Sequence, residues 1–241
     1  MDRNNQEEPL ECEPGETPRI YRIVLTGGPG GGKTTSLLPI ANQFRPYGVQ
    51  VFHIQENSTM FFNSGAGFPA KASEGQRLCW ELCKIRCQLA MEDQFYTYAK
   101  STNKKITLIL SDRGSMDSAA YMSEENWKKV MNDGNFEYDT LCTNRYEMVI
   151  HLRTTAIGAL KYYDRKQNPA RRETPEEARD LDFLIEQKWS IHPNQIIIDN
   201  STDFPGKIKR ICEEIARFIG LDYTAAFNTI PATPKTPLVV L

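Results

Sequence analysis

The chain has 241 residues, of which 40% are hydrophobic and 25% charged, a balance typical of a globular protein with one sizeable core. The formal net charge is −2, and the 29 Lys and Arg residues are spread along the chain. This argues against a nucleic-acid-binding protein, which usually concentrates its basic residues on one face. No apolar run approaches the roughly 20 residues that span a bilayer, so we expect no transmembrane segment and a cytoplasmic protein.

The ends of the chain differ in composition from its middle. Residues 1–18 are acidic and rich in Pro and Glu, which predicts a disordered leader. Residues 224–241 are rich in Thr and Pro and end in an apolar run. This composition predicts a docked tail or the start of a truncated second domain. Residues 19–223 remain as one nucleotide-binding domain, for the reasons given below.

Five short apolar runs alternate with segments of helical character. We expect strands at residues 20–26, 49–54, 106–110, 147–152 and 195–199. Helices are expected at residues 33–45, 73–100, 123–133, 174–189 and 205–218, with N-terminal capping boxes at Ser73 and Thr174. Strands separated by helices predict an α/β fold, a parallel sheet with helices on both faces. In such a sheet, ligands bind at the carboxyl ends of the strands.

The segment Gly27–Thr34 matches the phosphate-binding pattern GxxxxGK[ST] and lies between an expected strand and an expected helix. Glycines let backbone N–H groups close around phosphate oxygens, and the helix N-terminus adds partial positive charge. The pattern predicts a P-loop with strand order 2-3-1-4-5. It also predicts a nucleotide-binding set made up of Gly28, Gly30, Gly31, Gly32, Lys33, Thr34 and Thr35.

A carboxylate follows the third expected strand. Asp112 is placed to hold Mg²⁺ together with Thr34, or to act as a base towards an acceptor hydroxyl. Arg113 comes next, where a motor-type ATPase usually carries a second acidic residue. This Asp-Arg pair is similar to the nucleoside and nucleotide kinases, where the Arg lies near phosphate. We therefore assign catalytic roles to Lys33, Asp112, Arg113 and, in the segment described next, Arg171.

Four arginines bracket a polar stretch between the fourth expected strand and the next helix: Arg153, Arg165, Arg171 and Arg172. In phosphotransferases this interval forms a lid whose arginines neutralise charge on the transferred phosphoryl group. The loop after the fifth strand contains Asn200 and Thr202, where such kinases place the residues that line the purine. With Arg153, these two residues complete the expected nucleotide contacts. His53, His151 and His192 show no ligand spacing and are interpreted as structural.

The expected acceptor side is formed by Glu56, Asp117 and Tyr121, near Phe61, Phe62 and Phe68 in a glycine-containing loop. A kinase needs an enclosed pocket there with a carboxylate near the acceptor hydroxyl. A nucleotide switch needs no such pocket but rearranges when the γ-phosphate leaves. Base preference is not readable, because the guanine-reading NKxD element is missing. GTP/GDP and ATP/ADP are both expected ligands.

Four segments, 26–35, 112–117, 144–152 and 198–204, resemble the nucleotide-binding domain shared by the bacterial NadR kinase and the eukaryotic TRPL-translocation-defect protein. The eukaryotic branch is the more similar, over roughly residues 19–221. For the bacterial branch the resemblance implies phosphorylation of a nicotinamide riboside. For the eukaryotic branch it implies GTP binding, phosphoinositide or phosphatidic acid binding, a location peripheral to membranes and a role in membrane-protein trafficking.

Two functions are therefore expected. The one favoured by the resemblance is a magnesium-dependent purine-nucleotide-binding module that regulates membrane-protein trafficking, with slow nucleotide hydrolysis. The alternative is a small-molecule kinase that transfers the γ-phosphate to a nucleoside-like acceptor. The P-loop, Asp112 and the lid arginines serve both. The sequence leaves the acceptor and the oligomeric state open.

Overall fold

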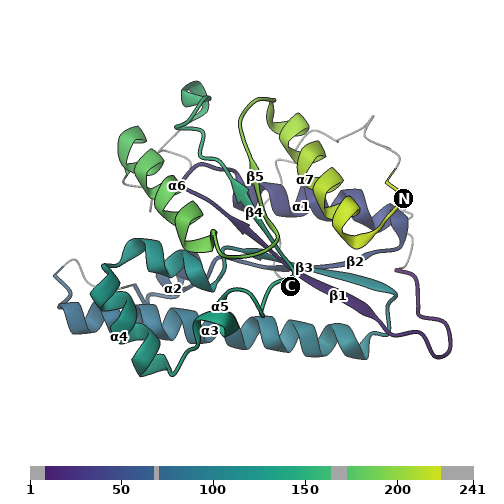
Figure 1. Cartoon of the computed structure of the whole chain (residues 1–241), viewed down its shortest axis with the longest axis horizontal. Helices are drawn as coiled ribbons and strands as arrows, with labels where there is room; N and C mark the ends of the chain where they lie inside the picture. The colour runs from purple at the N-terminus through teal and green to yellow at the C-terminus, as the bar shows by residue number, and fades with distance from the viewer. Residues whose placement is uncertain (1–8, 68–70, 164–172, 224–241) are drawn as a thin grey trace.

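The computed structural model describes residues 9–67, 71–163 and 173–223. Its centre is a five-stranded sheet in the order β2-β3-β1-β4-β5 (Figure 1). All neighbouring strands pair in parallel. The predicted strand order is thus confirmed. The strands are β1 Arg19–Thr26, β2 Gln50–Ile54, β3 Ile106–Asp112, β4 Met148–Leu152 and β5 Gln195–Ile198.

The helices connect the strands at the positions that the sequence pattern predicts, and the expected capping boxes at Ser73 and Thr174 are both present. Several short elements were not predicted, and two of them, α2 and the 3-10 helix η2, border the site described below. The helices are α1 Lys33–Phe44, α2 Asn57–Asn63, α3 Glu74–Ser101, α4 Glu124–Gly134, α5 Tyr138–Leu141, α6 Pro175–Trp189 and α7 Phe204–Ile219. The 3-10 helices are η1 Arg45–Tyr47, η2 Ser115–Tyr121 and η3 Leu160–Tyr162.

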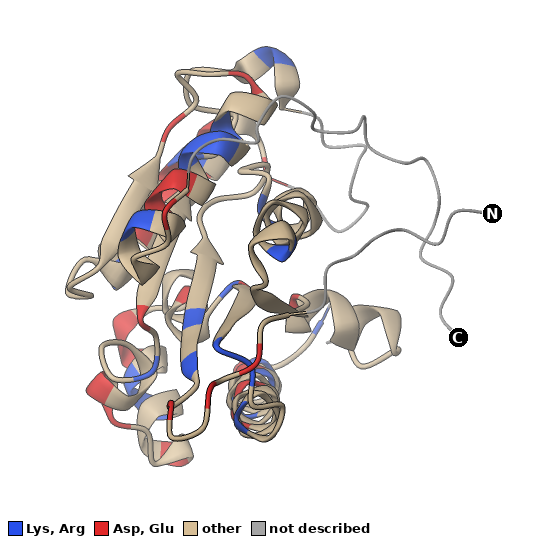
Figure 2. Ribbon diagram, turned by 90° about the vertical axis from the view of Figure 1, so that its right-hand side faces the viewer, with Lys and Arg blue, Asp and Glu red and all other residues tan. Residues whose placement is uncertain are grey.

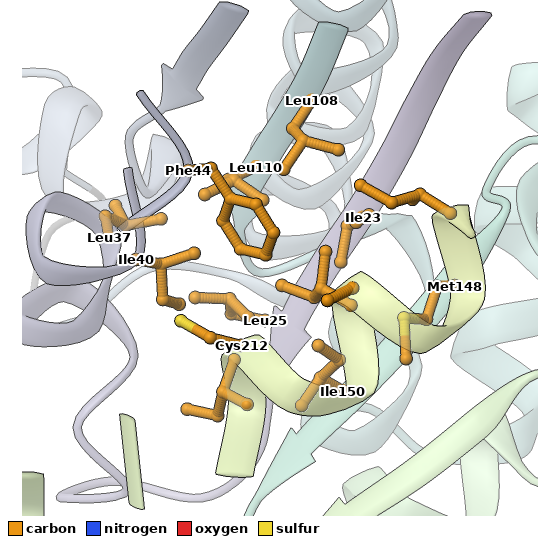
Figure 3. Close-up of a cluster of buried hydrophobic side chains, with 14 of the residues drawn as sticks. Ile23, Leu25, Leu37, Ile40, Phe44, Leu108, Leu110, Met148, Ile150 and Cys212 are labelled. Carbon is orange, nitrogen blue, oxygen red and sulfur yellow. The ribbon is translucent and has the colours of Figure 1, made fainter. Parts of the chain in front are cut away.

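Alternation along the strands divides the core between the two faces of the sheet. Ile23 and Leu25 of β1 point to one face, where α1 and α7 contribute Phe44 and Cys212 (Figure 3). Val24 points to the other face and packs with the side chains of α3, η2 and α6, including Trp189. Burying each large apolar side chain stabilises the fold by about 1.5–3 kcal/mol. Helices therefore cover both faces, as expected.

The central strands bring two predicted site segments together. All seven residues of β3 are buried, and Leu25 of β1 is in register with Asp112 of β3. The P-loop begins directly after β1, so the phosphate-binding segment and the Asp112 carboxylate leave the sheet side by side. This is the edge at which a parallel sheet binds its ligands.

The described part of the expected disordered leader is held by backbone hydrogen bonds. The Leu10 N–H donates to the Gly48 carbonyl at 2.8 Å, the Cys12 N–H to Asn103 at 3.0 Å, and the Lys105 N–H to Leu10 at 2.7 Å. This part of the chain satisfies its polar backbone groups on the turns that flank β2 and β3, which an acidic, Pro-rich composition does not reveal. The predictions for residues 1–8 and 224–241 fall outside the described residues.

Charged residues of both signs are mixed along the described part of the chain. Basic and acidic positions are interspersed along the helices rather than gathered by sign (Figure 2). Within the described ranges, none of the helices combines the length and apolar character needed to span a bilayer.

Candidate functional site

The P-loop depends on glycine at several positions. Gly27, Gly30 and Gly32 have positive φ angles of 127°, 77° and 90°, a conformation that L side chains rarely adopt. A Cβ on Gly27 would lie 2.2 Å from the Leu152 carbonyl oxygen, and one on Gly31 would lie 2.5 Å from the same atom. The loop is therefore packed against the end of β4. Gly32 precedes α1 with no side-chain cap, which leaves first-turn N–H groups for an anion.

Lys33 is folded onto its own loop. Its Nζ donates to the carbonyl oxygens of Gly27 and Gly28 at 2.8 and 2.9 Å, and the residue is only 7% exposed. Burial, aided by the nearby Arg113 charge, lowers the pKa of Lys33 to about 8. A bound phosphate would offer this ammonium a charged acceptor in place of two neutral carbonyls, so the side chain is well placed to shift to a ligand.

Thr34 and Asp112 meet directly, with the Thr34 hydroxyl donating to Asp112 Oδ2. Asp112 is 1% exposed, and its Oδ1 finds no hydrogen-bond partner among the described residues. Burial raises the pKa of this carboxyl above its usual range. A buried carboxylate oxygen without a partner beside a hydroxyl is a donor set suited to Mg²⁺, which prefers hard oxygen ligands. Thr34 and Asp112 thus fit the predicted metal site.

The predicted acceptor-side residues cluster around Arg113, which has a left-handed φ of 71°. Its Nε lies 2.5 Å from Glu56 Oε1, and its Nη1 lies 3.2 Å from Asp117 Oδ2. The guanidinium carbon also lies 5.7 Å from the centre of the Tyr121 ring. Burial alone would raise the pKa of Glu56, but the charges of Arg113 and Lys33 outweigh it and lower that pKa to about 2. Glu56 is therefore ionised at neutral pH.

Asp117 is fixed by donors from two further elements. Its Oδ1 accepts hydrogen bonds from the Thr26 hydroxyl at 2.6 Å and from the Trp189 indole N–H at 2.7 Å. The residue is 3% exposed. β1, η2 and α6 therefore converge on this one carboxylate, which gives the short helix η2 a defined position beside the P-loop.

A cavity of 1080 Å³ extends from the P-loop across the acceptor side. Its lining comes mainly from the P-loop, α2, the N-terminal half of α3 and η2. The cavity is partly open to solvent, and both carboxylates predicted for the acceptor side line it. Its lining includes Lys33, Thr34, Glu56, Phe62, Trp80, Gln88, Arg113, Asp117 and Tyr121.

The predicted nucleotide contacts at the ends of β4 and β5 have protein partners in this structure. Arg153 Nη1 is 2.8 Å from Asp182 and 2.6 Å from Glu186. The Asn200 amide donates to the carbonyls of Thr154 at 2.8 Å and Ile157 at 2.7 Å. The Asn200 side chain therefore fastens the loop after β5 to the segment after β4, whereas the Arg153 side chain fastens the end of β4 to α6.

Thr202 accepts a hydrogen bond from Arg210 at 3.1 Å. Arg153, Asn200 and Thr202 do not line the cavity, and their roles in nucleotide binding stay predictions. Arg165, Arg171, Arg172 and Phe68 lie outside the described residues, so their roles also stay predictions.

Two buried charged residues that touch the P-loop were not predicted from the sequence. Asp182 accepts a hydrogen bond from the Gly28 N–H at 2.8 Å. Lys207 donates to the Gly31 carbonyl at 3.2 Å and to Asn200 Oδ1 at 2.8 Å. Each occupies a place in the buried stripe of its helix, α6 or α7. A charged residue at an apolar position of a helix was the signal that could have revealed them.

Two of the histidines interpreted above as structural are buried and hydrogen-bonded. His151 Nε2 lies 3.0 Å from Asp182 Oδ2, and His192 Nε2 lies 2.8 Å from the Tyr146 carbonyl oxygen. The cluster of His151, Asp182 and Glu186 brings three metal-ligating side chains together. Arg153 already bonds both carboxylates, so a cation is present there without a metal.

Comparison with known proteins agrees with this geometry. A family model described as an AAA domain matches residues 22–207, more than half of the chain. The chain belongs to this AAA domain family. Among solved structures, the AAA domain is similar to thymidylate kinase from Ehrlichia chaffeensis. The identity is 16%, the TM-score is 0.52, and the match covers 84% of this chain and 100% of that one. No curated protein matches.

At that identity the likeness establishes the fold, a P-loop domain of the kinase-like type with five parallel strands. Such a fold implies a nucleotide ligand, usually with Mg²⁺. The narrower resemblance to the NadR and TRPL-translocation-defect branches stays a prediction, as do the choice between GTP and ATP, the lipid partners and the trafficking role.

Proposed function

We propose that this AAA domain binds a purine nucleoside triphosphate with Mg²⁺ and transfers the γ-phosphoryl group to a small acceptor in the cavity. The observation that carries the proposal is the 1080 Å³ cavity that opens from the P-loop and is lined by Glu56 and Asp117. Of the two functions expected from the sequence, the kinase is the one that needs a pocket for an acceptor at this position. A nucleotide switch needs no acceptor pocket.

The phosphate side of the proposed mechanism uses groups that are already in place. The N–H groups of the P-loop and of the first turn of α1 would donate to the phosphate oxygens. Lys33 would exchange the Gly27 and Gly28 carbonyls for a phosphate oxygen. Thr34 and Asp112 would hold Mg²⁺. When bound, this ion neutralises charge on the phosphates.

On the acceptor side, Glu56 would accept a hydrogen bond from the acceptor hydroxyl and so orient its oxygen towards the γ-phosphorus. The new bond joins that oxygen to phosphorus, the bond to the β–γ bridging oxygen breaks, and the nucleoside diphosphate leaves with the bridging oxygen. The hydroxyl proton passes to Glu56 and then to solvent. Arg113 bonds Glu56 and Asp117, and its charge would stabilise the transferred phosphoryl group.

A regulatory module is the second candidate, and one chain of contacts favours it. Thr34 bonds Asp112, and the next residue, Arg113, bonds Glu56 at the N-cap of α2. Binding of Mg²⁺ and nucleotide would separate Thr34 from Asp112, and that movement can pass through Arg113 to α2. The resemblance to the TRPL-translocation-defect branch would then assign this switch to membrane-protein trafficking, with phosphoinositide or phosphatidic acid as lipid partner.

The test begins with calorimetric titration of the chain with ATP, ADP, GTP and GDP in the presence of Mg²⁺. Release of nucleoside diphosphate is then measured with and without nicotinamide riboside and a panel of other nucleosides. Phosphotransfer predicts that one acceptor stimulates release, and that Glu56→Gln loses the stimulation while keeping nucleotide affinity. Tight binding with slow release, indifferent to every acceptor, would favour the regulatory module. Failure of the chain to bind any of the four nucleotides would contradict both proposed functions.

A further inference from the structure

Asp182 is a buried carboxylate that the proposed mechanism does not use. It lies on α6 with 0% exposure. Its Oδ1 accepts hydrogen bonds from the N–H groups of Gly28 at 2.8 Å and Thr154 at 2.9 Å. Its Oδ2 lies 3.0 Å from His151 Nε2 and 2.8 Å from Arg153 Nη1. One side chain therefore ties the P-loop to the segment after β4.

The contact with the P-loop leaves little room for movement. A Cβ added to Gly28 would lie 2.8 Å from Asp182 Cβ and 2.8 Å from Asp182 Oδ1. Burial alone would raise the pKa of Asp182, but hydrogen bonds from His151 and from the Gly28 and Thr154 backbone lower it to about 2. The carboxylate is therefore charged at neutral pH, and hydrogen bonds to a charged acceptor are stronger than those between neutral groups.

The same helix also reaches the acceptor side. Two turns after Asp182, Trp189 donates its indole N–H to Asp117 Oδ1 at 2.7 Å, and it is fully buried. A helix is stiff over this distance, with a fixed rise of about 1.5 Å per residue. The Gly28 end of the P-loop and the Asp117 carboxylate are therefore held at a spacing set by α6.

We propose that Asp182 is a positioning residue that fixes Gly28 and so holds the P-loop ready for phosphate before the nucleotide arrives. A phosphate-binding loop points several N–H groups at one place, which is unfavourable until an anion neutralises them. A contact that holds the loop open in advance spares the ligand that ordering cost. The inference rests on nucleotide binding by the P-loop, which is part of the proposed function.

The experiment compares the affinity of the wild-type chain for Mg²⁺-ATP and Mg²⁺-GTP with that of three variants, measured by calorimetry. Asp182→Ala removes every contact of the carboxylate. Asp182→Asn keeps an oxygen that can accept from Gly28 and Thr154 but loses the charge that faces Arg153. Ile185→Ala is the control for lost stability, because Ile185 is fully buried on the same helix and its side chain has no polar atom that could bond the P-loop. Melting temperatures are recorded for all of them.

For the nucleotide that the wild type binds, we expect Asp182→Ala to weaken affinity by about tenfold or more, the loss typical of a buried hydrogen bond to a charged group. Asp182→Asn should recover affinity to within about threefold of the wild type. Ile185→Ala should lower the melting temperature while affinity stays close to the wild type. The experiment therefore compares the nucleotide affinities of Asp182→Ala and Ile185→Ala, two variants that both lose stability.

Three results would overturn the inference: equal affinity in Asp182→Ala and wild type, an Asn variant as weak as the Ala variant, or an equal loss in Ile185→Ala. If Asp182→Ala does not fold, Asp182→Leu takes its place, because Leu has a similar shape and no oxygen that can accept from Gly28 and Thr154. A wild-type chain that binds neither nucleotide would instead refute the proposed function, so the two failures are distinguishable.

Discussion

Replacement of Asp112 by Asn should move stability and magnesium binding in opposite directions. Asp112 is 1% exposed, and its Oδ1 has no hydrogen-bond partner among the described residues. Burial raises the pKa of this carboxyl above its usual range.

A carboxyl whose pKa is higher in the folded than in the unfolded state stabilises the fold at pH values below the unfolded pKa. This stabilisation is lost as the pH rises through the folded pKa. At neutral pH the charge therefore destabilises the fold. The substitution removes that charge and keeps the acceptor for Thr34.

The size of the effect follows from the buried oxygen. An unsatisfied buried polar group costs about 1–3 kcal/mol, and more when it is charged. Because the Asn NH2 group that takes the place of Oδ1 also lacks a partner, we expect Asp112→Asn to raise the free energy of unfolding by only about 1 kcal/mol. For a chain of this length, that gain corresponds to a rise of about 2–4 °C in the melting temperature without nucleotide. Functional residues often make the fold less stable in this way.

The stabilisation that Mg²⁺ and nucleotide provide should be smaller in Asp112→Asn than in the wild type. Mg²⁺ and a nucleotide at about a hundred times the dissociation constant stabilise a native protein by about 2.7 kcal/mol. An amide in place of the Asp112 carboxylate offers Mg²⁺ no charged ligand, so Asp112→Asn should lose most of this stabilisation. The assay is thermal denaturation of both proteins, with and without Mg²⁺-nucleotide. A variant that melts lower than the wild type without nucleotide, yet keeps the full magnesium-dependent shift, would refute the reasoning.

Three further perturbations test the P-loop and its surroundings. Lys33→Ala should weaken Mg²⁺-nucleotide binding by about tenfold or more while leaving the fold intact; unchanged affinity by calorimetry would contradict the phosphate role. The pKa of Lys33 is about 8, below its ordinary value of 10.5. The native state therefore binds fewer protons between these values, and the free energy of unfolding without nucleotide should rise from about pH 8 towards about pH 10 relative to Lys33→Met. Nucleotide affinity should fall over the same range, and a flat profile in both would count against a buried ammonium. Gly28→Ala should cost about 1–3 kcal/mol through overpacking against Asp182, whereas Gly75→Ala, whose Cβ meets nothing within 4 Å, should not; equal melting temperatures would argue against the close contact.

The sheet and the phosphate-binding loop were predictable because each rests on local chemistry. Short apolar runs such as β3 can only be buried strands in this context, and the spacing of glycines before Lys33 and Thr34 has a direct physical reason. The capping boxes at Ser73 and Thr174 gave the start of α3 and α6, because the residues that satisfy the first N–H groups lie within one turn. Strand order then followed from the fold that such a loop implies.

The elements that shape the acceptor side could not be predicted in the same way. Helix α2 has seven residues and η2 is a 3-10 helix of seven, too short for periodicity to appear. The position of η2 depends on contacts with distant residues, Thr26 and Trp189 at Asp117. The residues predicted for the acceptor side lie close together around Arg113, but this arrangement depends on the backbone turn after β3, and their role stays a prediction.

Long-range pairing also explains the residues that were missed. Asp182 contacts Gly28 across 154 positions, and Lys207 contacts Gly31 across 176. Only their place in an otherwise apolar helix face marked them as unusual. Conversely, Asn200 was predicted as a purine contact from its place after β5, but its amide group is occupied by backbone carbonyls. The position of a residue along the chain predicted the region in which its side chain lies, but not the group to which that side chain is hydrogen-bonded.

The central claim is that the cavity beside the P-loop holds a phosphoryl acceptor. The most direct measurement is to incubate the chain with Mg²⁺ and either ATP or GTP and a panel of nucleosides, and then to search the products by mass spectrometry. The account predicts a phosphorylated acceptor formed in equal amount to the nucleoside diphosphate, and its loss in Glu56→Gln. Release of the γ-phosphate only as inorganic phosphate, with every acceptor, would contradict it.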